Sequence, residues 1–204
     1  MTKVSLIVAA LVPKYGIGYK GQLPWALKEE MRYFRRITTQ TADKNKKNAV
    51  VMGRKTWESI PERFRPLKGR VNVVLTRDVS SFLGRYSEEV EKHGDDVKVA
   101  DSLRSALQTL DMDIIEEVFV IGGAELYNDV LRTTPELVDR LLVTEVRTEK
   151  ELEMDAFINI GALWRKQDPH VWKSYLASKG LANEFSQDNY EADFRFSYHI
   201  YARC

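Results

Sequence analysis

A carboxylate at position 30 borders the apolar side of a predicted helix. Leu27, Met31 and Phe34 stand at i, i+4 and i+7, the spacing of one helical stripe. At about 100° per residue, Glu30 lies within roughly 60° of Leu27 and 40° of Phe34, whereas Glu29 points away. Such an acid either reaches solvent at the edge of the stripe or is partly buried beside a hydrogen-bonding partner. In the second case, desolvation would raise its pKa.

A glycine-spaced loop precedes this helix and reads Gly-Ile-Gly-Tyr-Lys-Gly-Gln-Leu-Pro-Trp over residues 16–25. Glycine permits positive φ and lets main-chain amides approach a ligand closely. The loop contains the letters G-x-G-x-x-G, but Pro24 and Trp25 separate it from the helix, unlike a dinucleotide fingerprint. Spacing alone favours a connecting loop with a buried tryptophan.

Two cations, Arg54 and Lys55, follow Gly53, where an apolar run gives way to a predicted helix start. Cations are unfavourable at a helix N-terminus unless an anion is present, because the macrodipole there favours negative charge. Together with the Thr56 hydroxyl they favour a phosphate site over a pair of solvated cations.

Arg70 and Arg77 stand at the two ends of the next apolar run. Arg70, at the start, could bind a carboxylate through two parallel hydrogen bonds. Arg77 and Thr76 follow the end of the run, on the edge where α/β sheets bind ligands. Taken singly, each arginine is more often an ordinary surface residue.

A further apolar run leads into Gly122 and Gly123 and then directly into a predicted helix. A strand, two glycines and a helix in that order place main-chain amides at a helix N-terminus. That arrangement is suited to binding a pyrophosphate.

Short apolar runs and amphipathic segments predict the elements that must position these residues. Successive β-branched residues indicate strands buried on both faces, over residues 4–12, 49–52, 71–75, 118–121 and 141–146. Amphipathic spacing predicts helices over 26–37, directly after Gly53, over 102–110 and over 124–131. The alternation indicates an α/β fold with a mainly parallel central sheet flanked by helices.

The C-terminal region follows a different pattern. Apolar and polar residues alternate over 194–203, which predicts an antiparallel strand near the sheet edge with one wetter face. We expect residues 171–176 to be its hairpin partner, and residues 38–48 and 87–98 to be surface loops. Neither loop has the length or bias of a domain linker, so we expect one domain over residues 1–204.

Composition excludes several classes. The chain has 204 residues, of which 44% are hydrophobic, and 31 Lys+Arg against 30 Asp+Glu give a net charge of +1. Balanced charge argues against nucleic-acid binding as the main activity. One cysteine and three widely separated histidines predict neither a disulfide framework nor a metal site. No apolar run approaches the roughly 20 residues that span a bilayer, so we expect a soluble, cytoplasmic protein. We also expect it to be a monomer.

Read in order, these segments resemble dihydrofolate reductase, in a form similar to the fungal type. The resemblance covers about residues 4–203 and includes an acid five residues after Trp25. It rests on Ile-Val-Ala at 7–9, the loop 16–25, Met-Gly-Arg-Lys-Thr-Trp-Glu-Ser-Ile-Pro at 52–61, Arg-Pro-Leu-Lys-Gly-Arg at 65–70 and Val-Ile-Gly-Gly-Ala-Glu-Leu-Tyr at 120–127. It implies NADPH-dependent reduction of 7,8-dihydrofolate to tetrahydrofolate, with hydride to C6 and a proton to N5, in support of one-carbon metabolism.

The resemblance also implies roles in binding the substrate. Glu30 would accept hydrogen bonds from the pterin, Thr144 would support that network, and Trp25 would shield the site and hold a water. Arg70 would bind the α-carboxylate of the glutamate tail, and Leu67 would lie beside the aminobenzoyl group. The other substrate contacts that it implies are Ile7, Val8, Met31, Phe34, Ser59, Ile60, Phe64, Ile121 and Tyr127.

For NADPH, the resemblance implies three groups of residues. Those near the nicotinamide and its ribose would be Ala9, Gly16, Ile17, Gly18, Tyr19, Lys20, Gly21, Gln22 and Tyr127. Those near the phosphates would be Gly53, Arg54, Lys55, Thr56, Gly122, Gly123, Ala124, Glu125 and Leu126. The 2′-phosphate would meet Thr76, Arg77 and Asp78, which would favour NADPH over NADH.

Two departures and three alternatives accompany the resemblance. Residues 155–159 lack the proline usual after the family's Asp-x-Phe pattern, and the loop from Ala10 to Gly16 is one residue longer than in vertebrate forms. A pyrimidine reductase of riboflavin synthesis shares a related fold, but the spacing of Trp25 and Glu30 favours the folate enzyme. A non-catalytic nucleotide-binding module would need neither Glu30 nor Arg70. RNA binding has the least support.

Overall fold

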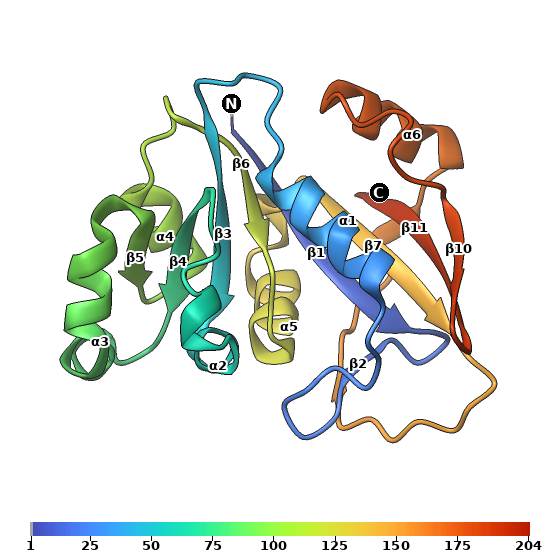
Figure 1. The fold of residues 1–204 in the computed structure, drawn as a ribbon, viewed down its shortest axis with the longest axis horizontal. Coiled ribbons are helices and arrows are strands. Elements are labelled where there is room, and N and C mark those ends of the chain that lie inside the picture. Colours follow the sequence, from blue (N-terminus) through green and yellow to red (C-terminus); the bar gives the residue numbers. More distant parts are fainter. Residues whose placement is uncertain (1) are drawn as a thin grey trace.

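A mixed sheet of eleven strands runs through the structure, a computed structural model that describes residues 2–204. Eight of these strands follow the hydrogen-bonded order β10-β11-β7-β1-β6-β3-β4-β5 (Figure 1). The strands are β1 (Lys3–Leu11), β2 (Gly16–Gly18), β3 (Lys47–Gly53), β4 (Arg70–Leu75), β5 (Val97–Ala100), β6 (Ile115–Val120), β7 (Arg140–Arg147), β8 (Ala156–Phe157), β9 (Trp164–Lys166), β10 (Asp188–Glu191) and β11 (Phe194–Arg203).

The predicted α/β fold is confirmed. Strands β7, β1, β6, β3, β4 and β5 are joined by parallel pairs, and β11 runs antiparallel to both β7 and β10. The five apolar runs of the sequence are β1, β3, β4, β6 and β7. Their side chains alternate between two core clusters, one on each face of the sheet, which explains why successive residues are apolar.

Six helices complete the layers among residues 2–204: α1 (Lys28–Thr39), α2 (Arg54–Ser59), α3 (Val79–His93), α4 (Leu103–Thr109), α5 (Ala124–Thr133) and α6 (Pro169–Ser178). Side chains of α1, α2, α3 and α6 pack into one core cluster, whereas those of α4 and α5 pack into the other. The sheet is therefore covered by helices on both faces, with α1 lying across β1 and β7 (Figure 1).

Residues 171–176 are not a strand, and that prediction was wrong. They lie in α6, where Trp172, Tyr175 and Leu176 are buried at helical spacing and Asp168 caps the first turn. The hairpin partner of β11 is β10, whose polar sequence gave no strand signal. Val171, Trp172 and Tyr175 are residue types that favour strands, and they led to the strand prediction. The helical spacing of the buried residues in this segment is the signal that would have indicated a helix.

The two predicted surface loops are corrected in part. Residues 40–46 do form a loop, of which 42–45 are exposed, whereas residues 97 and 98 belong to β5. Residues 87–93 continue α3, a helix with a single fully buried side chain, Phe82, and hence a weak amphipathic pattern. Thr38 closes the last turn of α1 and Asn48 belongs to β3, and both are completely buried. Thr38 and Asn48 are thus polar residues of the interior, and Asn48 donates a hydrogen bond to the Thr38 carbonyl. Composition alone does not show that a polar residue is buried.

Candidate active site

Glu30 is buried in the first turn of α1, with 6% of its surface exposed. The Thr144 hydroxyl on β7 donates a hydrogen bond to Glu30 Oε1 over 3.3 Å. Burial raises the pKa of Glu30 to about 7, and the hydrogen bond from Thr144 opposes that shift. Of the two outcomes considered for this acid, the structure thus selects the buried one with a partner.

The buried face of α1 differs from the predicted stripe. Tyr33 and Ile37 join Glu30 in the interior, whereas Met31 is 52% exposed and Phe34 is half-buried. Of the expected stripe, Leu27 is buried, whereas Met31 and Phe34 lie to one side of the buried face. The side chains of Met31 and Phe34 are therefore on the more open side of the helix that carries Glu30, where a ligand could cover them.

Strand β1 presents alternate side chains to this region. Ile7 and Ala9 pack with the core cluster on the α1 side, whereas Val8 belongs to the cluster on the opposite face. Ala9 pairs in register with Thr144, next to the Glu30 hydrogen bond. The structure thus brings Ile7 and Ala9 to the site and turns the Val8 side chain away from it.

The remaining predicted apolar contacts differ in exposure. Ile60, Leu67 and Ile121 are half-buried and pack against the cluster that contains Ile7. Phe64 is 54% exposed. Ser59 is exposed, and its hydroxyl donates to the Thr56 carbonyl at 2.6 Å, within its own helix.

Arg70 is a buried cation without a carboxylate partner in the part of the chain that the structure describes. Its side chain donates to the Lys68 carbonyl (3.1 Å) and to the Thr38 hydroxyl (2.9 Å). Burial and the nearby Arg35 lower its pKa to about 10, so it remains charged at neutral pH. A buried guanidinium in this state requires an anion, as expected for a substrate carboxylate. Thr38, which orients Arg70, was missed because its polarity and position indicated a loop.

The glycine-spaced loop is held by a segment distant in sequence. Gly16 and Gly18 of β2 pair with Phe157 and Ala156 of β8. Lys20 N also donates to Asp155 Oδ2 at 2.9 Å. The segment without the expected proline therefore runs beside this loop and fixes its path.

Trp25, at the end of the same loop, is buried, and its ring meets Phe194 edge-on at 6.5 Å between centroids. Its Nε1 has no hydrogen-bond partner within residues 2–204. A buried donor of this kind carries a desolvation cost that a bound water or ligand would relieve.

Three glycines meet at the carboxyl edge of the parallel strands. Gly53 N donates to the Gly122 carbonyl over 2.8 Å, which joins the ends of β3 and β6. Gly122 has φ of +113°, and a Cβ there would lie 3.1 Å from the ring of Tyr127. Gly123 N-caps α5 without any side-chain hydrogen bond, so the first amides of that helix are free for an anion. These features fit a cradle for a dinucleotide phosphate.

Predicted cofactor residues surround this cradle. Thr56 lies close to Gly123: a Cβ added to that glycine would be 3.4 Å from Thr56 Oγ1. Lys55 forms an ion pair with Glu125, with 3.7 Å between Nζ and Oε1. Arg54 forms an ion pair with Glu58 at 2.7 Å. The Tyr127 hydroxyl donates to the Ile7 carbonyl at 2.6 Å, which ties α5 to β1 between the cradle and the acid.

Thr76, Arg77 and Asp78 follow β4 at the same edge of the sheet. Asp78 caps α3 by accepting from Ser81 N at 2.8 Å, and its own amide donates to Thr76 Oγ1 at 3.3 Å. Arg77 is exposed and forms no ion pair within residues 2–204. Its charge is therefore available to a ligand.

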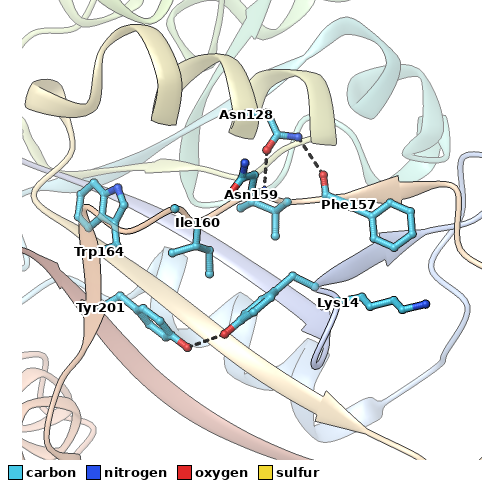
Figure 2. A pocket seen from close by; sticks show the side chains of 10 residues that line it. Lys14, Asn128, Phe157, Asn159, Ile160, Trp164 and Tyr201 are labelled. Atoms are coloured by element: carbon cyan, nitrogen blue, oxygen red, sulfur yellow. Dashed lines mark hydrogen bonds between the residues drawn. The ribbon is translucent and has the colours of Figure 1, made fainter.

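A separate hollow of about 610 Å³ is lined by residues outside the predicted site (Figure 2). Asn128 of α5 binds the backbone of residues 157–159. Its Nδ2 donates to the Phe157 carbonyl, and its Oδ1 accepts from Asn159 N, both at 2.8 Å. The hydroxyls of Tyr15 and Tyr201 are 3.0 Å apart, and Tyr201 also donates to Glu145 at 2.7 Å. These contacts support the back of the glycine-spaced loop.

No helix of residues 2–204 has the length and apolar character needed to cross a membrane.

The buried acid leads to a prediction for stability. The pKa of Glu30 is about 7 in the folded protein and near 4.5 in the unfolded chain, so the folded state binds more protons between these values. The free energy of unfolding therefore falls as pH rises from 4.5 to 7. At pH 8 we expect Glu30→Gln to be more stable than the parent by at most about 3 kcal/mol, a difference that vanishes below pH 4.5. Urea unfolding across this range measures it, and a pH-independent difference would contradict burial as the cause.

Comparisons with known proteins define the class and then the family. The family model for dihydrofolate reductase matches residues 3–197. The chain is 40% identical over 203 residues to dihydrofolate reductase of Candida albicans, covering 98% of this chain and 97% of that protein. It is 36% identical over 209 residues to the enzyme of Pneumocystis carinii, covering 94% and 95%. The structure of Schistosoma mansoni dihydrofolate reductase superimposes with a TM-score of 0.71 at 30% identity, covering 100% and 99% of the two chains.

These matches and the fold establish an α/β oxidoreductase. The chain belongs to the dihydrofolate reductase family, and the expected similarity to the fungal form is confirmed by its Candida albicans and Saccharomyces cerevisiae relatives, each 40% identical.

Proposed function

We propose that this enzyme reduces 7,8-dihydrofolate to tetrahydrofolate with NADPH. The observation that carries the proposal is the buried Glu30, with a pKa of about 7, placed between β7 and the open side of α1. A pKa near neutrality lets one carboxyl group both accept hydrogen bonds and hold a proton at working pH. The family membership supports the same reaction.

In this proposal Glu30 orients the substrate. Its ionised carboxylate accepts the N3–H and 2-amino donors of the pterin side by side, which fixes the ring in the site. The Thr144 hydroxyl holds the Oε1 atom at 3.3 Å and so limits rotation of the carboxylate. When protonated, Glu30 would hold the proton destined for N5, and the unpartnered Trp25 Nε1 would donate to a water on the route.

When bound, NADPH would supply the hydride that goes to C6. We infer that Gly122 and Gly123, where an added Cβ would approach Tyr127 and Thr56, would hold its pyrophosphate, and that Ala9 would face its nicotinamide. Tyr127 buttresses the cradle through its bond to Ile7. Arg77 contributes an exposed positive charge for the 2′-phosphate.

The test is the loss of NADPH absorbance on adding dihydrofolate. Turnover of dihydrofolate supports the proposal, and turnover of a pyrimidine substrate in its place would favour the riboflavin-type reductase. Binding of NADPH without turnover of either would leave a nucleotide-binding module. We further propose a cytoplasmic, monomeric enzyme made of a single domain, which sedimentation and cell fractionation would check.

Arg77→Ala is expected to narrow the preference for NADPH over NADH by roughly tenfold to a hundredfold. A charge-assisted contact to the 2′-phosphate contributes about 1.5–3 kcal/mol, and that phosphate is the difference between the cofactors. Lys55 and Arg54 lie on a neighbouring helix, which favours the lower figure. The KM of both cofactors should be measured on both proteins; an equal loss for NADH would instead assign Arg77 to the shared pyrophosphate or to the fold.

A further inference from the structure

The helix that carries Glu30 lacks a cap of its own. Leu27 occupies the N-cap position of α1 and offers no side-chain hydrogen bond. An N-cap side chain normally satisfies one of the free amides of the first turn. At α1 the cap comes from elsewhere: Lys28 N donates to Glu191 Oε1 at 2.8 Å, and Glu29 N donates to Glu191 Oε2 at 3.1 Å.

Glu191 is the last residue of β10 and lies 163 positions along the chain from Lys28. Its carboxylate uses both oxygens on the two residues that directly precede Glu30. These backbone hydrogen bonds, that from Lys28 first, lower the pKa of Glu191, so it stays ionised at neutral pH. An anion at this point also complements the positive end of the helix macrodipole.

The same hairpin contacts the site at other points. Phe194, the register partner of Glu191, packs edge-on against Trp25. Further along β11, Tyr198 stacks on Tyr33 of α1 at 3.8 Å and pairs in register with Thr144, the partner of Glu30. The hairpin of β10 and β11 therefore contacts both α1, which carries Glu30, and β7, which carries its partner Thr144.

From this geometry we propose that Glu191 is a positioning residue for Glu30. It fixes the first turn of α1 so that the Glu30 carboxylate remains buried and aligned with Thr144. The inference rests on the proposed function, because it concerns the acid of that reaction. Glu191 itself touches neither substrate nor cofactor in this proposal.

The variant Glu191→Ala tests the role. It frees two main-chain amides, loosens the first turn and lets water reach Glu30. We expect kcat for dihydrofolate reduction to fall roughly tenfold to a hundredfold, because small displacements of a catalytic group are costly. The KM for NADPH should be unchanged, because the cofactor cradle lies on α5 and β6. Glu191→Gln, which keeps an acceptor oxygen, should recover part of the loss and serves where the alanine variant folds poorly.

A pH profile separates positioning from a merely structural role. Hydration of Glu30 would lower its pKa from about 7 toward its ordinary value, so the pH dependence of kcat should move to lower pH. The ionisable groups coupled to Glu30 are the phenols of Tyr33, Tyr127 and Tyr198. Burial raises the pKa of all three, so they stay neutral throughout. If the substitution only reduced the fraction of folded protein, the measured rate would fall at every pH and the midpoint of the pH profile would not move.

Two matched variants complete the experiment. Asp193→Ala removes a carboxylate from the turn that follows Glu191. The carboxylate of Asp193 pairs with Lys150 and not with α1. Glu184→Ala removes the ion pairs to Arg32 and Arg36, on later turns of α1, at 3.0 and 2.7 Å. Both should keep the parent kcat and pH profile. A fall in kcat with Glu184→Ala equal to that with Glu191→Ala, or no change in the Glu191 variants of an active parent, would overturn the inference. A parent without dihydrofolate turnover would instead refute the proposed function.

Discussion

Glu30→Gln is expected to lower the turnover of dihydrofolate by roughly 10²- to 10⁴-fold, the range for losing a positioned acid–base group. The amide keeps the shape of the carboxylate and can still accept from Thr144. It cannot accept both pterin donors side by side, and it has no acidic proton to donate at neutral pH. The parent's rate should fall as pH rises through about 7, whereas the residual rate of the variant should be flat.

NADPH binding provides the control for this variant. The cofactor cradle is formed by β3, β6 and α5, so fluorescence titration should give the parent Kd for NADPH. Unchanged turnover with dihydrofolate would remove Glu30 from the mechanism. A rate that still titrates near pH 7 in Glu30→Gln would assign the titration to another group.

Arg70→Lys is expected to raise the KM for dihydrofolate by roughly tenfold to a hundredfold, with a smaller effect on kcat. Lysine places a point charge where the planar guanidinium can bind a carboxylate through two parallel bonds. The substitution also removes the hydrogen bonds that the guanidinium donates to the Thr38 hydroxyl and the Lys68 carbonyl. The position of the charge is then less well fixed. Charge-assisted bonds of this kind contribute about 1.5–3 kcal/mol.

Arg65→Lys is the matched control, because Arg65 is also largely buried but pairs with Glu89 at 2.8 Å. It should reduce thermal stability and leave the KM for dihydrofolate unchanged. A large loss of kcat at saturating substrate in Arg70→Lys, with little change in KM, would contradict the role given to Arg70.

The sequence was sufficient for five of the six parallel strands, whereas β5 begins inside the predicted loop 87–98 and was missed. Strands buried on both faces have unbroken apolar runs, so β1, β3, β4, β6 and β7 could be located to within a few residues. The glycines at positions 53, 122 and 123 could be predicted to lie together, because the carboxyl ends of parallel strands meet at one edge. The order of the motifs then identified the family.

Contacts between distant segments could not be derived from spacing, and the one between Glu30 and Thr144 was expected only through the resemblance. The burial of Glu30 depends on β7 and β11, which supply Thr144 and Tyr198 across more than a hundred residues. The cap from Glu191 leaves no local signal, because a glutamate in a polar turn has no periodicity that links it to α1. Likewise, a polar Thr38 beside a loop gave no indication that it orients Arg70.

The position of β11 in the chain has a consequence for synthesis on the ribosome. β11 pairs with β7, stacks Tyr198 on α1 and bonds Tyr201 to Tyr15, yet it is made after every other strand of the described sheet. The glycine cradle, by contrast, is complete once α5 has emerged. A growing chain therefore acquires the parts of its nucleotide cradle well before it can bury its acid. Translation arrested between α5 and β11 should leave a chain without reductase activity.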